Sequence, residues 1–424
     1  MPKKEPCISK EMRQHLNCVN FLRGQGNAKP QEWRMATRGY VDPRTLAAPF
    51  SEYLQEVHRF LFGGGVRFDV VDAGPDDDRQ MVLNAIAAGN SLDPMLQTIW
   101  EQAAITGKVL ILWLPSRGPK LYQLKVFNGY EFKSIPGVEG GYEMSYVGTD
   151  GLWHFKEVDR LSYREYEPSE QWKDDWGLPV VEYEHGYPFT PAQVLLNKAE
   201  DPKGLVSGSD FDQTAIDLGI EYALQFLDAA SNAHFFGRPI VVSPDPRETL
   251  QALRRRSGVL QGSNMKTDQQ PLEVLEPASM PSNHRELRRD LKENLYNHLG
   301  ISVVPDDIPA QTSSVTLKML YSETIGKAEA KMSTLGEGLR KMLEGLLYSA
   351  AFDGVLGNVF YDPGSPLVTI GRQHPYFTPS PQEKLALAGL VESLIATGVK
   401  PEFALQEYYP GLTQEQLQER LVGF

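Results

Sequence analysis

The longest helical periodicity in this sequence begins at Ser313 or Ser314 and continues to about Ala351. It predicts one helix, which at roughly 1.5 Å per residue is more than about 50 Å long. The apolar stripe consists of Leu317, Leu320, Ile325, Ala328, Met332, Leu335, Leu339, Met342, Leu343, Leu346 and Leu347. The same segment contains Gly326, Gly336, Gly338 and Gly345. Each glycine costs up to about 1 kcal/mol relative to alanine, so we predict one or more kinks, or a close packing contact, at these positions.

Two further long helices precede this segment. The first is expected to begin at Ser209, which forms a capping pair with Asp212, and to run to about Phe236. The second is expected to begin at Asn283 and to end at Gly300. One face of the second helix carries leucines at 287, 291, 295 and 299.

The segment between these two helices, 239–281, predicts a compact β-α-β insert. Strands are expected at 240–243 and 272–275, and a short helix at 247–256. After the second helix, the loop 301–312 contains two prolines and cannot be helical throughout. Because this loop also holds Ile301, Val303, Val304 and Ile308, we expect it to be ordered.

The first 200 residues predict a mixed α/β region, and the whole chain is assigned to the α+β class. Helices are expected at 12–22, 49–61 and 93–105. Strands, joined as one meander, are expected at 109–114, 120–127, 142–147, 152–158 and 160–167. An irregular stretch follows at 172–202, and the C-terminal part predicts a strand at 367–370 and helices from Ser380 onward.

The net charge of the chain is −13, from 42 basic and 55 acidic residues. This balance argues against a protein that holds nucleic acid tightly through its phosphates. It is compatible with a passage through which DNA slides, because an acidic wall repels phosphates; an equally good explanation is that the charge keeps the protein soluble. No window approaches the roughly 18 apolar residues of a membrane span, and the start lacks the apolar stretch of a signal peptide. We therefore expect an intracellular protein with no membrane partner.

The sequence contains none of the usual catalytic or cofactor-binding signatures, among them HExxH, GxSxG, GxGxxG, a Walker sequence and an EF-hand loop. Cys7 and Cys18 are expected to be free thiols, and the eight histidines show no metal-ligand spacing. The glycines at 63–65 and the aspartates at 76–78 are interpreted as turns rather than as a phosphate loop and a cation site. We expect no enzyme activity, no cofactor and no metal.

Two basic clusters stand out against the acidic composition. Arg254, Arg255 and Arg256 end the short helix of the insert, where positive charge complements a helix C-terminus; contact with a partner is the alternative. The other cluster falls at i, i+3, i+4 and i+7 of the second long helix and consists of Arg285, Arg288, Arg289 and Lys292. On a monomer such a stripe is usually a solvated face. In a ring it would line a tunnel or form salt bridges between subunits.

The order of these elements resembles the portal (head-to-tail connector) proteins of tailed double-stranded DNA bacteriophages. The stretch 207–212 resembles the family's serine- and aspartate-led start of its first stem helix. The stretch 295–305 resembles the family's helix end, which runs through a glycine and a hydrophobic residue to a proline. The serine-rich stretch 312–318 resembles the start of the long wing helix, and 380–424 is similar to the family's helical C-termini.

This resemblance divides the chain into the parts of a portal subunit. The parts are a wing at 1–203 and 314–379, stem helices at 204–236 and 282–300, a clip at 237–281, a tunnel loop at 301–313 and a helical crown at 380–424. Family portals form a closed ring, twelvefold in the virion, at one capsid vertex, where the large terminase docks on the clip and drives DNA through the ring. The implied location is the virion, with assembly in the host cytoplasm, and the implied roles are genome packaging and ejection. The implied partners are copies of the chain, the large terminase, neck adaptor or tail proteins, the major capsid or scaffolding protein, and double-stranded DNA.

The resemblance also implies roles for particular residues. Stem packing would fall to Leu287, Leu291 and Leu295, since a closed ring buries apolar stripes between neighbours. Transient phosphate contacts or pairs between subunits would fall to Arg285, Arg288, Arg289 and Lys292. The tunnel would be narrowed by Val303, Val304, Pro305, Asp306, Asp307 and Ile308. Contact with terminase or an adaptor would fall to Asp245, Glu248, Arg254, Arg255 and Arg256.

Two other classes of protein stay open on the sequence alone. Another head-tail connector, neck adaptor or minor capsid protein would share the acidic composition, although the length of the chain and its paired long helices favour the portal. A hydrolase or nuclease would need a site that forms only in three dimensions.

Overall fold

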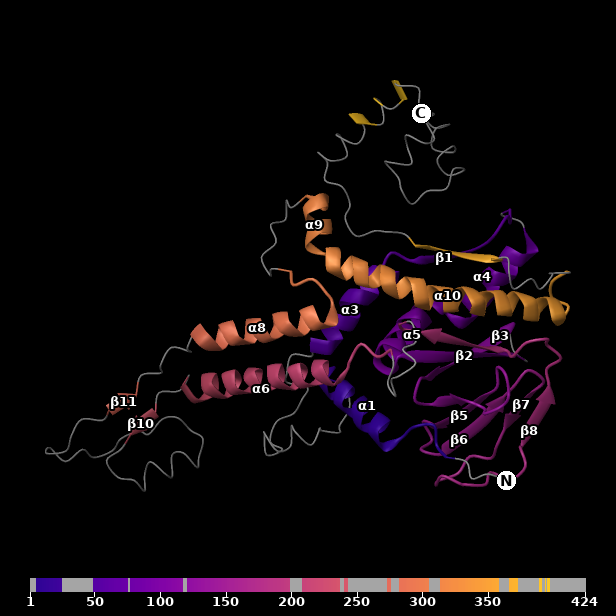
Figure 1. The fold of residues 1–424 in the computed structure, drawn as a ribbon, viewed down its shortest axis with the longest axis horizontal. Helices are drawn as coiled ribbons and strands as arrows, with labels where there is room; N and C mark the ends of the chain where they lie inside the picture. Colours follow the sequence, from indigo (N-terminus) through magenta and orange to yellow (C-terminus); the bar gives the residue numbers. More distant parts are fainter. Residues whose placement is uncertain are drawn as a thin grey trace.

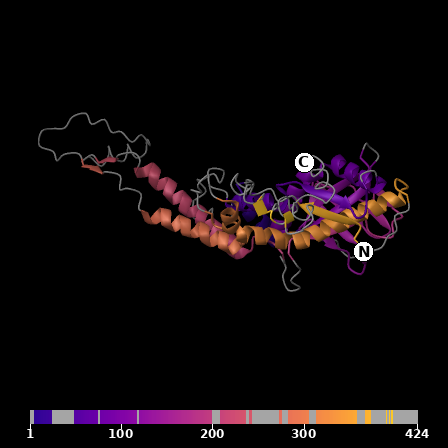
Figure 2. The ribbon, with the colours of Figure 1, turned by 90° about the horizontal axis from the view of Figure 1, so that it is seen from above.

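The computed structural model describes residues 5–24, 49–74, 77–116, 120–198, 208–236, 240–242, 273–275, 282–304, 313–357, 366–372, 389–390, 393 and 395–396. It shows a mixed helix and sheet protein, as the sequence predicts (Figure 1). A body contains the larger sheets and most of the helices, and two helices project together from one side of it (Figure 2). Within the ranges given above, no helix is both long enough and apolar enough to cross a bilayer.

The body is built around α10 (Ser322–Phe352), which packs against a three-stranded antiparallel sheet of order β3-β2-β9. The strands are β2 (Lys108–Pro115), β3 (Tyr122–Asn128) and β9 (Ala192–Leu196). Most of β2 is buried because it is the central strand and is covered on both faces. Helices α3 (Pro49–Phe62) and α5 (Leu92–Thr106) complete the core, in which Trp100 and Trp113 are buried.

A second, five-stranded antiparallel sheet lies beside the first. Its strands, in spatial order, are β4 (Phe132–Ser134), β5 (Tyr142–Val147), β6 (Trp153–Val158), β7 (Ser162–Glu165) and β8 (Val181–Glu184). The predicted strands are present, but the prediction that they form one meander is wrong, since two of them belong to the first sheet. The stretch predicted to be irregular contains β8 and β9, which are too short and too close to prolines to give a clear alternation.

The helices predicted near the N-terminus are confirmed as α1 (Lys10–Leu22), α3 and α5. Helix α4 (Asp78–Asn90) was not predicted. Its N-terminal cap is Asp77, whose Oδ1 accepts a hydrogen bond of 2.8 Å from the Arg79 amide. Asp77 and Asp78, two of the aspartates predicted to form a turn, therefore begin a helix, and Asp76 lies outside the described residues.

A two-stranded antiparallel sheet joins an early strand of the chain to a late one. Strand β1 (Val66–Val70) pairs along its full length with β12 (Val368–Arg372), which confirms the strand predicted at 367–370. Helix α4 packs against β1, and α10 packs against β12.

The helix predicted from Ser314 to Ala351 is interrupted once, and not at a glycine. A short helix, α9 (Ser314–Leu320), ends at Tyr321, and α10 then continues without a break to Phe352. The cause is tertiary: the Tyr321 ring packs against Phe60, and the Thr324 amide donates to Ser302 Oγ at 3.3 Å. Two of the glycines instead lie at close packing contacts, which was the alternative to a kink in the sequence prediction. A Cβ on Gly338 would lie 3.0 Å from Leu195, and one on Gly345 would lie 2.7 Å from the Trp113 ring.

Candidate functional site: a projecting helical hairpin and its buried attachment

The feature that distinguishes this fold is a pair of long helices that leave the body together. Helices α6 (Gln213–Phe236) and α8 (Ser282–Leu299) lie side by side, and we call them the hairpin (Figures 1 and 2). At its far end are β10 (Ile240–Val242) and β11 (Glu273–Leu275), which pair antiparallel. The two predicted long helices are confirmed, and so are the two strands of the predicted insert between them. The short helix predicted at 247–256 lies outside the described residues.

The start of α6 differs from the predicted capping pair. Asp212 caps the helix, since its Oδ1 accepts a hydrogen bond of 2.9 Å from the Ala215 amide and lies 2.8 Å from Nε2 of His298 on α8. Ser209 takes no part in the cap. Its hydroxyl donates to the carbonyl of Ile105 at 2.8 Å, which ties the segment before α6 to the end of α5. Of the two residues predicted to cap α6, Asp212 therefore caps the helix, and Ser209 attaches the preceding segment to the body.

A buried carboxylate lies next to this attachment. Oδ1 of Asp210 is 2.6 Å from Nζ of Lys331 on α10 and 3.1 Å from Nζ of Lys198, which follows β9. Oδ2 accepts a hydrogen bond of 2.9 Å from the Tyr53 hydroxyl of α3. Lys331 donates a second bond, of 2.8 Å, to Oδ1 of Asn197. We call these five residues the Asp210 cluster, and they join the base of the hairpin to three elements of the body.

Burial and charge act in opposite directions inside the cluster. Burial lowers the pKa of Lys331 to about 7, against the attraction of the neighbouring Asp210 carboxylate. Burial alone would raise the pKa of Asp210, but the charges of Lys331, Lys327 and Lys198 outweigh it and hold this pKa below its usual value. An ion pair in such a place is weak evidence for stability, because desolvation offsets much of the attraction. It does fix geometry, since each group has few positions in which its partners are satisfied.

The other helix of the hairpin is attached through α3. Leu291 and Leu295 of α8 are buried within the chain, and Tyr296 donates from its hydroxyl to Oε2 of Glu52 at 2.5 Å. The same carboxylate lies 3.3 Å from Nζ of Lys292. In contrast, Leu287, one turn further out, is 42% exposed. Two of the three leucines predicted to pack the stem are thus covered by their own chain, and the third is not.

The predicted basic stripe does not form one uniform surface. Lys292 faces the body, where it pairs with Glu52 and lies over the Tyr296 ring. Arg289 is exposed and pairs with Glu293 at 2.9 Å along the same helix. Arg288 is half-buried, and the side chain of Arg285 lies outside the described residues.

The structure covers the other predicted site residues only in part. Val303 is exposed and Val304 half-buried at the end of the stretch that follows α8. The remaining tunnel-loop and clip residues lie outside the described residues, and they are Pro305, Asp306, Asp307, Ile308, Asp245, Glu248, Arg254, Arg255 and Arg256. The described part of the chain also holds no group of three or more His, Cys, Asp or Glu side chains that could bind a metal ion.

The Asp210 cluster was not found by sequence reasoning, although one signal was present. Lys327 and Lys331 stand one turn apart on the longest helix, next to Ala328 and Met332 of its apolar stripe. A charged residue within a stripe that faces the core needs a buried partner. Nothing in the sequence, however, identifies that partner as Asp210.

Comparison with known proteins gives only distant structural similarity. No protein-family model matches the sequence, and no curated protein matches it. Among solved structures, a chain from the neck of an empty gene transfer agent (GTA) particle computed with C6 symmetry is 12% identical, with a TM-score of 0.47 over 83% of this chain and 87% of that one. A chain from the neck of a native GTA particle computed with C12 symmetry is 12% identical, with a TM-score of 0.45 over 91% and 95% of the two chains. A chain from the virion of a native GTA particle is 13% identical, with a TM-score of 0.37 over 81% and 88%.

Proposed function

We propose that this chain is one subunit of a ring-shaped portal, the head-to-tail connector through which DNA enters and leaves a phage-like particle. The observation that carries the proposal is the hairpin of α6 and α8 (Figure 1). It projects from a body that is built from chain on both sides of it in the sequence, and it ends in a pair of strands. In the portal family, which the sequence resembles, this order corresponds to wing, stem, clip, stem and wing.

The partly exposed stem supports assembly with neighbours. Leu287 is 42% exposed, although it lies on the same helix face as the buried Leu291 and Leu295. In a ring, α6 or α8 of the next subunit would cover this outer part of the stripe, and the heterologous contact would close on itself. Arg285 and Arg288 would then be placed for ion pairs between subunits.

The charges of the hairpin support a passage for DNA rather than a tight binding site. The exposed positions of its described side chains include Asp217 and Glu221 on α6 and Glu286 and Asp290 on α8. The one exposed arginine among them, Arg289, is already paired with Glu293. Surfaces of this kind repel phosphates, so DNA would pass without being held.

The remaining assignments follow from the same proposal. The segment 237–281 would be the clip, with Asp245, Glu248 and Arg254–Arg256 toward terminase or a neck adaptor, and 301–313 would be the tunnel loop. The protein would act in the virion without enzymatic activity of its own, as part of the capsid vertex where tail proteins attach. Binding assays with terminase, the neck adaptor and tail proteins would test these proposed partners directly.

Electron microscopy of the purified full-length chain tests the proposal. Negative-stain images should show rings with a central hole as wide as duplex DNA, and sedimentation should show one large closed species. The substitution Leu287→Asp on the hairpin should shift the population toward monomers. Leu161→Asp, at a 72% exposed position in the turn between β6 and β7, is the matched control and should leave the rings intact. Only monomers under all conditions, or a turnover activity of the isolated chain, would contradict the portal assignment.

A further inference from the structure

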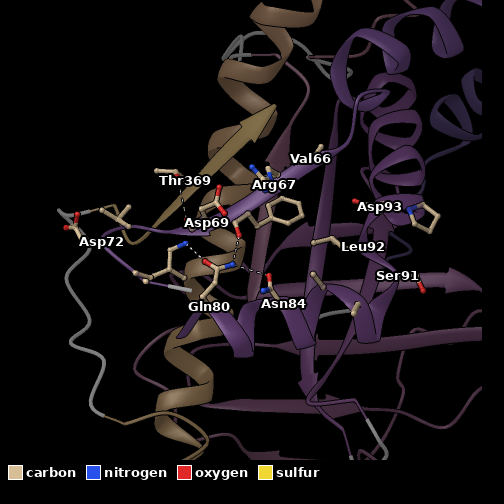
Figure 3. A pocket seen from close by; sticks show the side chains of 18 residues that line it. Val66, Arg67, Asp69, Asp72, Gln80, Asn84, Ser91, Leu92, Asp93 and Thr369 are labelled. Atoms are coloured by element: carbon tan, nitrogen blue, oxygen red, sulfur yellow. Dashed lines mark hydrogen bonds between the residues drawn. The ribbon is translucent and has the colours of Figure 1, made fainter. Parts of the chain in front are cut away.

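Strand β1 has two edges, and among the described strands a partner, β12, pairs with one of them. The second edge borders a groove of about 1240 Å³, which Figure 3 shows from close by. The opposite side of the groove is formed by α4, with Gln80 and Asn84 toward one end and Ala87, Ala88 and Ser91 toward the other. The alanines and the serine are small, so they leave the space beside the strand open.

The pairing with β12 determines which backbone groups face the groove. The Val71 amide donates to the carbonyl of Leu367 at 2.9 Å, and backbone groups of successive strand residues point to opposite edges. The amides and carbonyls of Asp69 and Arg67 therefore point toward β12. Those of Val66, Phe68 and Val70 point toward the groove.

One side chain already pairs with part of this edge. The Gln80 carboxamide donates from Nε2 to the Phe68 carbonyl at 2.9 Å and accepts at Oε1 from the Val70 amide at 2.8 Å (Figure 3). A residue of a parallel neighbouring strand would make the same two bonds. Gln80 is held in this position by a third bond, of 3.0 Å, from Nε2 to Oδ1 of Asn84. It stands where the first residue of an added strand would stand.

Beyond Gln80 the edge continues without such a substitute. The Phe68 amide and both backbone groups of Val66 face the groove, and no side chain of the described residues pairs with them. A strand edge with unpaired amides and carbonyls beside open space is the surface to which extended peptides add in β-augmentation. The open groove allows a further strand at the usual spacing of about 4.8 Å.

The charge of the groove indicates what kind of segment fits. Among the described residues, its lining contains the exposed carboxylates of Asp69, Asp72 and Asp93 and one cationic side chain, Arg67. Acidic walls disfavour phosphate groups and favour lysine or arginine side chains. Because side chains alternate along a strand, basic residues at every second position would all lie on one side of the added strand.

We propose that this groove binds an extended, basic segment of another protein, which adds to β1 beyond Gln80 as a third strand of the β1–β12 sheet. The proposal does not depend on the portal assignment, because it concerns a different face of the body. The strand would be bound by backbone hydrogen bonds to Val66 and Phe68, and its basic side chains would lie near Asp69 and Asp93.

A synthetic peptide of alternating lysine and valine, labelled for fluorescence anisotropy, tests the site on the full-length protein. It should bind in the groove and slow hydrogen exchange at Val66 and Phe68. Two further versions, one N-methylated at its valines and one at its lysines, each lack the donors on one edge of the strand. The version that loses the donors facing β1 should bind about tenfold more weakly, the loss expected for one or two hydrogen bonds. A peptide with glutamate in place of lysine should show a loss of at least this size. Equal binding of the unmodified peptide and of both N-methylated versions would reveal general attraction to an acidic surface and would overturn the proposal.

Two substitutions on α4 locate the binding. Ala88→Phe fills the groove and should abolish binding, whereas Ala85→Phe adds the same ring at an exposed position of the same helix that does not line the groove. Gln80→Ala releases the Phe68 carbonyl and the Val70 amide and should tighten binding. If Ala88→Phe and Ala85→Phe bind the peptide equally well, the groove is not the site.

Discussion

Nζ of Lys331 lies 2.6 Å from Oδ1 of Asp210, although the two residues are 121 positions apart in the sequence. Solvent reaches only 3% of the lysine side chain and none of the aspartate side chain. The pair joins the segment that leads into α6 to the middle of α10. It thus connects the projecting hairpin directly to the longest helix of the body.

Removing the aspartate should destabilise the protein. Below pH 7, Asp210→Ala leaves the buried Lys331 either with an unpaired charge or forced to lose its proton, and the free energy of unfolding should fall by about 3–5 kcal/mol. Hydrogen exchange should accelerate first at the start of α6. Asp217→Ala, at an exposed position one turn along the same helix, is the control and should change stability by no more than about 0.5 kcal/mol. Similar losses in both variants, measured by urea denaturation, would show that the cluster has no special role.

The pKa of Lys331 gives the stability a defined pH dependence. This pKa is about 7 in the folded protein and 10.5 ordinarily, so between these values the unfolded chain binds a proton that the folded chain has lost. The free energy of unfolding should therefore rise with pH from about 7 to 10.5, relative to that of Lys331→Met. Below pH 7 both states hold the proton, and the difference between the two proteins should be flat until Asp210 begins to titrate. A difference that stays constant across the alkaline range would exclude a neutral Lys331.

Two glycines of α10 should respond in opposite directions to the same substitution. Gly345→Ala places a methyl group 2.7 Å from the Trp113 ring. It should lower the free energy of unfolding by about 1–3 kcal/mol. Gly326→Ala meets no atom within 4 Å and should stabilise the helix by up to about 1 kcal/mol. Thermal unfolding of both variants provides the measurement. If Gly345→Ala is also stabilising, α10 does not pack against β2 as described.

Charge reversal on the hairpin tests the proposed ring. Arg285→Glu with Arg288→Glu should weaken assembly by about tenfold or more, because pairs between subunits become repulsive contacts. Sedimentation velocity at low and moderate salt would measure the ring fraction, and the defect should shrink as salt screens it. Arg160→Glu with Lys173→Glu reverses the same charge on the body and serves as the control. Unchanged rings and unchanged DNA packaging in the first variant would contradict the stem role of these arginines.

The sequence predicted the long helices well because their apolar spacing persists over many turns. It missed the break at Tyr321, since the contacts with Phe60 and Ser302 that cause it are distant in the chain. It missed α4 although Asp77, followed three residues later by Gln80, is a recognisable capping signal.

The candidate site was less predictable than the fold. Successive helix residues point about 100° apart, so two neighbouring members of the basic stripe differ in exposure: Arg288 is half-buried and Arg289 is exposed. Which end of such a stripe is covered depends on α3, and therefore on tertiary structure. The partners of Lys331 are equally invisible in the sequence, because Asn197 and Asp210 precede it by 134 and 121 positions.

The pairing of β1 with β12 has a consequence for the order of folding. The Thr369 hydroxyl donates to the carbonyl of Asp69, 300 residues earlier. At the usual rate of about 5–20 residues per second, the ribosome needs roughly 15–60 s to make the chain between them. During that interval β1 has no strand on either edge, and such edges are templates for pairing between chains. The edge of β1 is thus covered only when the C-terminal part with β12 has been synthesised, and not when the N-terminal half alone is complete. Nascent chains truncated before residue 368 should therefore be the most prone to aggregate.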